Sequence, residues 1–209
     1  MNLLTKNMNI NTDTDTDTDT DTDTDSKKIL FNKDNVLFTR IKKNNFELSF
    51  TIENNNIFLS KIIDFSLIKL IQDLNKDIYE KTDIQNISSD EINLFFLLQH
   101  FFKDIGFPQK FSFVNVKKIV EEDKISFFTK TIYKLPEIFD IPVNSELLPI
   151  EDMISVCNVI TPHKVEFFIT LQFNDSLYLP EFVQKLLSII SYKVIKRLKL
   201  FIDKLNNNT

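Results

Sequence analysis

The sequence predicts an α+β domain in which a curved antiparallel sheet packs against one long C-terminal helix. Alternating apolar and polar residues, the pattern of strands with one buried face, recur between residues 46 and 173. Short turn sequences join these segments, which favours antiparallel hairpins. A sustained helical pattern follows, and a long helix with one apolar stripe is suited to cover the concave face of a twisted sheet.

The first predicted strand covers residues 46–52, where apolar and polar side chains alternate. Mixed three- and four-residue spacing over residues 57–79 then predicts a helix or two short ones. Residues 88–91, Ser-Ser-Asp-Glu, have the form of a capping box before an apolar run, so a second helix is predicted from about Ser89 to Lys103. Two shorter helices are therefore expected after the first strand.

Two hairpins are predicted next. The first occupies residues 111–133 around the charged turn 121–124, and the second occupies residues 153–173 around the turn 161–164. Three prolines lie between the hairpins, and proline cannot donate to a strand ladder. Any strand near residues 137–143 is therefore expected to be short and to lie at an edge or bulge.

The last element has the strongest helical pattern. From Leu179 to Leu205, apolar residues recur at three- and four-residue spacing. Roughly 27 residues at about 1.5 Å each give a helix near 40 Å long. Pro180 suits its first turn, and Asp175 or Ser176 is a candidate cap.

The order of these elements, from about Phe46 to Leu205, resembles the helix-grip fold shared by START-like lipid-transfer domains and Bet v 1-like proteins. The resemblance also rests on the passage VEFFITLQFNDSLYLPEFVQKLLSIISYKVIKRL, where a last strand enters a long helix through a proline. It implies a sheet and helix that enclose a cavity for a sterol, a phospholipid or another apolar ligand. The chain departs from the Bet v 1 pattern because it lacks a Gly-rich loop.

The 209 residues predict one folded domain, residues 29–209, after an N-terminal tail, residues 1–28. From Thr12 to Asp25 the tail alternates strictly between Thr and Asp. Its anions repel one another and it has no apolar side to offset the entropy of ordering, so we expect disorder. An acidic lure, a phosphorylatable tract and a repeat without a role are alternative interpretations. The rest of the chain, with 25 basic and 23 acidic residues (30 less the seven in the tract), carries about +2.

Composition excludes several classes of function. Cys157 is the only cysteine, so an internal disulfide and a multi-cysteine zinc site are excluded, and a reducing, cytoplasmic setting is expected. Gly106 is the only glycine, which excludes Gly-rich phosphate loops. Neither a secretion signal nor the roughly 18 to 20 uninterrupted apolar residues of a membrane-spanning helix is found.

Apolar side chains of the sheet and the long helix are the candidate ligand-binding residues, because small-molecule pockets are mostly apolar with few orienting polar groups. They are Phe111, Phe113, Phe127, Phe167, Ile169, Leu171, Leu186, Ile190 and Val194, with Phe173, Phe182 and Phe201 as further candidates. The alternative is a plain packed core, since protein interiors normally fill to crystal-like density.

Residues with catalytic or metal-binding chemistry are scarce. His100 and His163 have no acid and nucleophile close by in the sequence, which favours structural or surface roles. The acidic turns 121–123 and 151–152 lack the ligand spacing and glycine of a calcium loop. Cys157 is expected to be buried and unreactive. We therefore predict no catalytic residues, no metal ligands and no cofactor.

The long helix also carries a basic face. Lys193, Lys196, Arg197 and Lys204 are candidates for contact with an anionic membrane surface, with a merely solvated face as the alternative. The charge of about +2 outside the tail is far from that of a dedicated nucleic-acid binder, so no nucleic-acid partner is expected.

The function expected from these observations is non-enzymatic binding or transfer of an apolar, lipid-like ligand. The main alternative is a protein-interaction or scaffold domain with a filled core and no small-molecule ligand. An enzyme that uses a histidine or carboxylate in a cavity is a third hypothesis, without positive support from any motif.

Overall fold

The protein was analysed as a computed structural model, which describes residues 27–205. The Thr-Asp tract, for which the sequence predicts disorder, lies outside the described residues. The strands are β1 (Lys28–Lys33), β2 (Val36–Lys42), β3 (Asn45–Glu53), β4 (Tyr79–Ser88), β5 (Glu91–Leu98), β6 (Gln109–Val120), β7 (Lys124–Thr131), β8 (Ser145–Leu147), β9 (Ile150–Thr161) and β10 (Lys164–Phe173). The helices are α1 (Phe65–Leu74) and α2 (Glu181–Asp203), with short 3-10 turns η1 (Leu59–Lys61) and η2 (Lys103–Ile105).

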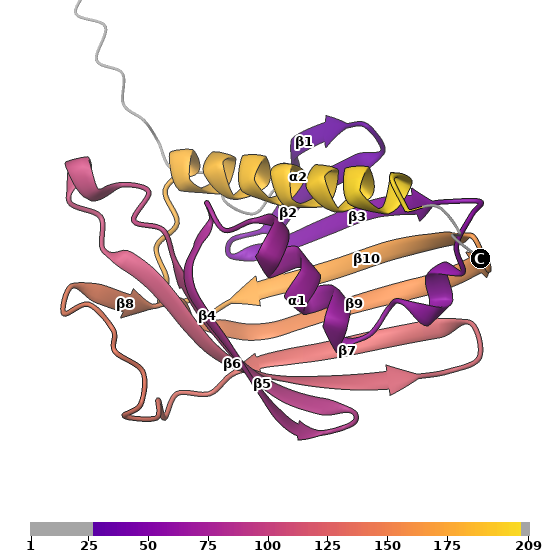
Figure 1. The fold of residues 1–209 in the computed structure, drawn as a ribbon. Helices are drawn as coiled ribbons and strands as arrows, with labels where there is room; N and C mark the ends of the chain where they lie inside the picture. Colours follow the sequence, from indigo (N-terminus) through magenta and orange to yellow (C-terminus); the bar gives the residue numbers. More distant parts are fainter. Residues whose placement is uncertain (1–26, 206–209) are drawn as a thin grey trace, which may run out of the picture.

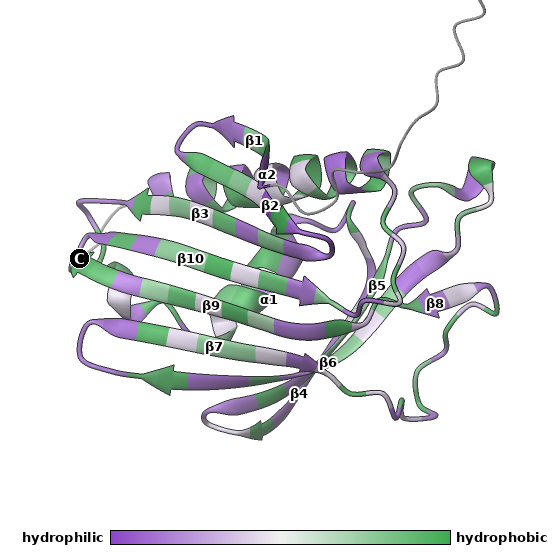
Figure 2. Cartoon of the chain, turned by 180° about the vertical axis from the view of Figure 1, so that it is seen from behind, coloured by the Kyte–Doolittle hydropathy of each residue, from purple (hydrophilic) through white to green (hydrophobic). Residues whose placement is uncertain are grey.

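Within residues 27–205 the strands form one ten-stranded sheet. Its order is β1-β2-β3-β10-β9-β7-β6-β5-β4, with antiparallel pairing between all neighbours on this path, and β8 adds to β6 in parallel. Both α-helices lie on the same face of the sheet, with α2 running along it (Figure 1). Seen from behind, the strands stand in front of the helices and alternate between hydrophobic and hydrophilic residues (Figure 2). The predicted α+β class, with an antiparallel sheet against a long C-terminal helix, is confirmed.

Helix α2 is held to the rest of the protein along its length. Near its start, Glu181 pairs with Lys28 of β1. In its middle, the Tyr192 hydroxyl donates a hydrogen bond to the Asp34 carboxylate in the β1–β2 turn. At its end, the Asn54 side chain donates to the Ile202 carbonyl at 2.5 Å, which satisfies one of the carbonyls that a helix C-terminus leaves unpaired. These contacts fix α2 over the sheet.

The predicted helix 89–103 is wrong, because this segment forms strand β5. Residues 88–91, taken as a capping box, instead make the turn of the β4–β5 hairpin. Ile92 and Leu94 are buried in the main core, while Phe95 and Leu97 are buried on the opposite face. A strand that is apolar on both faces has no alternating pattern, so periodicity alone does not distinguish it from a buried helix. One α-helix, not two, therefore follows the early strands.

Two strands precede the first predicted one. The predicted strand 46–52 is confirmed as β3, but β1 and β2 come before it, and β1 begins one residue before the predicted start of the domain. The turn between them places Asp34 and Asn35 at φ 54° and 56°. Two successive residues with positive φ make the hairpin turn whose twist suits paired strands, and Asp and Asn tolerate that conformation. This Asp-Asn pair was the available signal.

The remaining predicted elements are close to those observed. Both hairpins are present as β6–β7 and β9–β10, and residues 57–79 contain η1 and α1. No strand forms within residues 137–143, and the three-residue strand β8 follows at residues 145–147, after Pro142. Helix α2 has 23 residues, about 35 Å at 1.5 Å each. Pro180 takes the cap position without a side-chain hydrogen bond, so neither Asp175 nor Ser176 caps the helix.

A second, smaller core lies on the sheet face opposite the helices. Phe95 and Leu97 of β5 and Phe113 of β6 are buried there with Phe139 of the proline-rich segment. The rings of Phe95 and Phe139 stack with centroids 4.2 Å apart. The proline-rich segment therefore covers the outer face of β5 and β6, leaving the other face for the interior beneath α2.

Candidate functional site

A partly open cavity of about 390 Å³ lies between the sheet and the two helices. Strands β2, β3, β5, β6, β7, β9 and β10, together with the first residue of β4, line it from one side, and α1 and α2 line it from the other. Six lining residues carry a polar group, and the rest are hydrophobic. The six are Asp64, Gln72, Tyr79, Thr129, Ser155 and Ser191.

Alternate residues of each strand reach the cavity. On β10 these are Phe167, Ile169, Leu171 and Phe173, whereas Phe168 on the other face is 48% exposed. The ring of Phe167 stacks on that of Phe50, its partner in the β3–β10 register, with centroids 4.7 Å apart. The period-two alternation of the strand thus supplies one continuous apolar wall.

The helices close the cavity with their apolar stripes. Helix α2 contributes Leu187, Ile190, Ser191 and Val194, which lie on one face at three- and four-residue spacing. Helix α1 is capped by Asp64, whose carboxylate accepts a hydrogen bond from the Ser66 backbone N–H at 2.7 Å. The helix lines the cavity with Leu67, Ile68, Ile71 and Gln72.

Water is a poor occupant of such a space. At about 30 Å³ per molecule, the volume corresponds to about 13 waters, and each ordered water needs two to four polar partners. The six polar lining residues cannot supply them. Pockets for small molecules commonly have volumes of about 300 to 1,000 Å³ and mostly apolar walls. The cavity therefore has the size and chemistry of a site for an apolar molecule.

Two of the polar groups lie where the chain leaves α1 and enters β4. Gln72 is 8% exposed, and Tyr79 packs edge-on against Phe96 with centroids 6.1 Å apart. Burial raises the pKa of Tyr79 from its ordinary value of 10.0 to about 12. Within residues 27–205, neither the Gln72 amide nor the Tyr79 hydroxyl has a hydrogen-bond partner.

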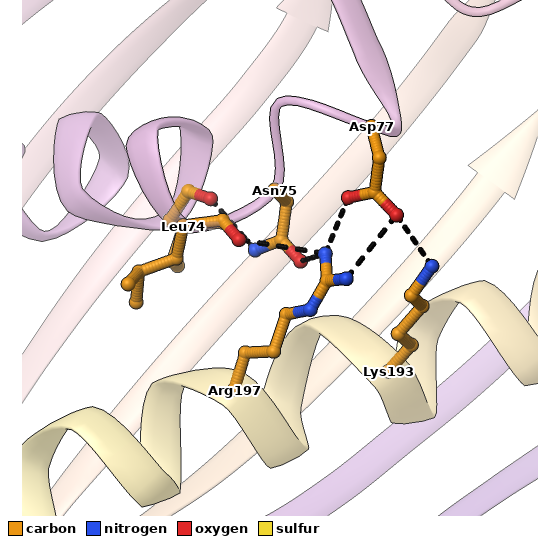
Figure 3. Close-up of polar contacts among 6 residues, drawn as sticks. Leu74, Asn75, Asp77, Lys193 and Arg197 are labelled. Carbon is orange, nitrogen blue, oxygen red and sulfur yellow. Dashed lines mark hydrogen bonds and ion pairs between the residues drawn. The ribbon is translucent and has the colours of Figure 1, made fainter.

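An ion cluster ties this same turn to α2 (Figure 3). Asp77 forms ion pairs with Lys193, at 2.5 Å, and with Arg197. The Arg197 guanidinium also donates to the Asn75 side-chain oxygen at 3.0 Å. The hydrogen bonds from Arg197 and Lys193 hold the pKa of the Asp77 carboxyl well below its usual range. The cluster fixes the α1–β4 turn against the helix that closes the cavity.

The structure places most of the predicted cavity residues at the cavity. Of the nine, Phe127, Phe167, Ile169, Leu171, Ile190 and Val194 line it, and so does the further candidate Phe173.

Three of the nine lie elsewhere, as do two further candidates. Phe111 and Phe113 belong to the outer core, because β6 directs Val114 and Val116 to the cavity and its odd-numbered residues away from it. Leu186 lies one residue before the lining residue Leu187 and is not part of the cavity wall. Phe182 is 42% exposed and contacts Phe102 and Phe107, whereas Phe201 packs against the main core.

Sequence reasoning missed the contributions of β2, β3, α1 and β5 to the cavity. Phe46, Leu48 and Phe50 sit on one face of a confidently predicted strand, so their alternation was a usable signal. Leu94 and Phe96 were missed because the sequence pattern was interpreted as a helix at that position. Gln72 and Tyr79 had no sequence signal, because a single polar residue in a helix or at a strand end is ordinary.

The four basic residues predicted to contact a membrane, in α2 and at its C-cap, divide into two pairs. Lys193 and Arg197 are engaged with Asp77, so they serve as internal ties rather than a free basic face. Lys196 and Lys204 are exposed, and the Lys196 ammonium lies 5.8 Å from the Tyr192 ring centroid.

The remaining chemically active residues lie outside the cavity wall. His163 contacts the Ile57 carbonyl through Nδ1 at 2.8 Å, and His100 contacts the Phe107 carbonyl through Nε2 at 2.5 Å. Cys157 is buried as expected, and burial raises the pKa of its thiol to about 12. Across residues 27–205, no group of three or more His, Cys, Asp or Glu residues is placed to hold a metal ion. In that same part of the chain, neither helix is long and apolar enough to span a bilayer.

Comparison with known proteins supports a fold assignment. No protein-family profile and no curated protein sequence matches the chain. Among solved structures, human STARD10 aligns with a TM-score of 0.65 and 7% identity, covering 84% of this chain and 72% of that one. The human StarD13 lipid transfer and protein localization domain aligns with a TM-score of 0.60 and 10% identity, covering 81% and 84%. A STAR-related lipid transfer protein from Xanthomonas axonopodis aligns with a TM-score of 0.59 and 8% identity, covering 86% and 100%.

At these identities the likeness concerns the fold. The sheet, the long C-terminal helix and the space between them are the features that the sequence pattern predicted from its resemblance to this fold. The chain therefore has the helix-grip fold of START-type lipid-transfer domains.

Proposed function

We propose that this chain binds an apolar, lipid-like ligand in the cavity between its sheet and α2, and carries that ligand without transforming it. The observation that carries the proposal is the apolar cavity of about 390 Å³, whose walls offer few partners to water. Two of the similar structures, the human StarD13 domain and the Xanthomonas axonopodis protein, are named for lipid transfer, which gives the proposal further support.

The alternative of a scaffold domain requires a filled core. A cavity of this size weighs against it, because protein interiors normally contain few voids larger than a water molecule. An unfilled void also destabilises a domain by about 24 cal/mol per Å³. A ligand that fills the space removes this cost, which gives the cavity a physical reason to be occupied.

Native mass spectrometry of the full chain, purified from expressing cells without organic solvent, tests the proposal. We expect a species heavier than the polypeptide by the mass of one small molecule, and its release on denaturation. The Ser191→Phe variant, which narrows the cavity from α2, is the matched control and should retain less of the same mass. Absence of any adduct, together with no binding of fatty alcohols, sterols or phospholipids to the delipidated protein, would contradict the proposal.

A further inference from the structure

We propose that the cavity selects uncharged lipids that carry one hydrogen-bonding polar group, such as a long-chain alcohol, over lipids whose charged group must enter it. This inference rests on the proposed function and names its ligand class. Two independent observations support it, which are the charge of the cavity wall and the uncharged, unpaired polar groups that line it.

The cavity wall offers no counter-charge to an anion. Within residues 27–205, the lining residues include no Lys, Arg or His, and the one carboxylate among them is Asp64. The Asp64 side chain caps α1 and adds negative charge to the wall. Lys193 and Arg197 flank the lining residue Val194 in sequence, but they pair with Asp77 and do not line the cavity. A buried anion without a cationic partner retains a large desolvation penalty.

Asp64 does not make the cavity a site for cations either. Its Oδ1 accepts hydrogen bonds from the backbone N–H and the hydroxyl of Ser66, at 2.7 and 2.5 Å. The carboxylate also sits at the N-terminus of α1, where the helix dipole already stabilises its negative charge. A cationic lipid would have to compete with these partners, whereas an uncharged lipid has no such requirement.

Five of the six polar lining residues have uncharged side chains without a hydrogen-bond partner within residues 27–205. They are Gln72, Tyr79, Thr129, Ser155 and Ser191. Gln72 is more than nine-tenths buried, lines the cavity and has no side-chain partner within residues 27–205. Tyr79 is half-buried and also lines the cavity, and its hydroxyl has no hydrogen-bond partner within residues 27–205. A carboxamide offers two donors and one acceptor, and a phenol offers one donor, so both suit a hydroxyl or an ester carbonyl.

The backbone places these two groups next to the same turn. The Asn75 backbone N–H donates to the Gln72 carbonyl at 3.0 Å, and the Tyr79 backbone N–H donates to the Asn75 carbonyl at 3.2 Å. The ion pairs of Asp77 then hold the turn against α2. A buried donor or acceptor without a partner is unfavourable. A ligand hydroxyl beside this turn would give the Gln72 amide and the Tyr79 hydroxyl the partner that the protein does not supply.

Three probes with the same hydrocarbon chain and different charge test the inference. Hexadecanol, palmitate and hexadecylamine are titrated at about pH 8, where the carboxylic acid and the amine are charged, against the delipidated full chain. Displacement of the neutral dye Nile red reports binding. The desolvation penalty of a buried ion is larger than the free energy that corresponds to an affinity difference of about 100-fold. We therefore expect hexadecanol to bind about 100-fold more tightly than either charged probe.

Equal or tighter binding of palmitate or hexadecylamine would overturn the inference while leaving the proposed function intact. Binding of none of the three, and of no other apolar probe, would overturn the proposed function and this inference with it.

A double variant and a matched control test whether Gln72 and Tyr79 bind the hydroxyl of the ligand. Combining Gln72→Leu with Tyr79→Phe removes the two unpaired groups beside the α1–β4 turn, and we expect the affinity for hexadecanol, relative to that for hexadecane, to fall about tenfold. Tyr133→Phe is the matched control, because Tyr133 is 63% exposed and bonded to Glu151 outside the cavity, and it should leave that ratio unchanged. An unchanged ratio in the double variant, with Nile red binding preserved, would contradict the assignment of Gln72 and Tyr79.

Discussion

Two serines on α2 provide a direct test of whether the space beneath the helix is empty. Ser191 lines the cavity, whereas Ser188 is 1% exposed and packed, with its hydroxyl bonded to the Lys185 carbonyl at 2.7 Å. Replacing either residue with phenylalanine makes the same chemical change on the same helix. Ser and Phe have similar intrinsic helix propensity, so propensity does not separate the two variants.

The expected effects have opposite sign. At about 24 cal/mol per Å³, an empty cavity of about 390 Å³ costs about 9 kcal/mol, and filling one third of it recovers about 3 kcal/mol. We expect Ser191→Phe to stabilise the delipidated protein by about 1 to 3 kcal/mol, the range for burying a phenylalanine. Ser188→Phe should destabilise it by about 1 to 3 kcal/mol, because it forces a large ring into packed surroundings.

Urea denaturation of the delipidated proteins measures the difference, read from the midpoints at equal slope. We expect the two variants to differ by at least about 2 kcal/mol, the sum of the smallest expected effects. Equal destabilisation by both substitutions would refute the reasoning, because it would mean that the region beneath Ser191 is as full as that beneath Ser188.

Three further predictions concern other parts of the molecule. Asp77→Asn should lower the free energy of unfolding by about 1 kcal/mol at neutral pH, since the ion pairs are partly exposed. Because folding lowers the Asp77 pKa, the contribution is present above the unfolded pKa of about 3.9 and is lost as pH falls, so the variant's denaturation midpoint should depend less on pH between about 5 and 2. Phe139→Ala should cost about 3 kcal/mol through the outer core, with the hexadecanol affinity of the folded protein unchanged; a large loss of affinity would contradict the separation of the two cores. Reversing the charge of Lys196 and Lys204 to Glu should reduce sedimentation with anionic phosphatidylserine vesicles, by about 1 kcal/mol per lysine, and unchanged sedimentation would remove the basic face as a membrane contact.

Much of the sheet could be predicted from the sequence because its strands have one polar face. In β3 and β10 the alternation is visible directly, and in α2 the helical stripe is long enough to be unambiguous. Strand β5 was missed because tertiary packing buries both of its faces, so its sequence lacks alternation. Local periodicity reports which side of an element is polar, and it fails where neither side is.

The candidate site was predictable in part for the same reason. The residues of β10 were assigned correctly because their opposite face is polar or exposed, whereas Phe111 and Phe113 were assigned to the wrong side of β6. That strand reads Phe-Ser-Phe-Val, and only the position of Phe139 on the outer face decides which phenylalanines point where. The unpaired groups of Gln72 and Tyr79 depend on the packing of three elements, which no local pattern encodes.

A crystal structure of the full chain with an ω-brominated hexadecanol tests the central claim most directly, because anomalous scattering locates the bromine without ambiguity. The account predicts bromine density between β10 and α2, with the hydroxyl end at Gln72 and Tyr79. Bromine on the outer surface, or α1 and α2 collapsed onto the sheet so that no space remains, would contradict it.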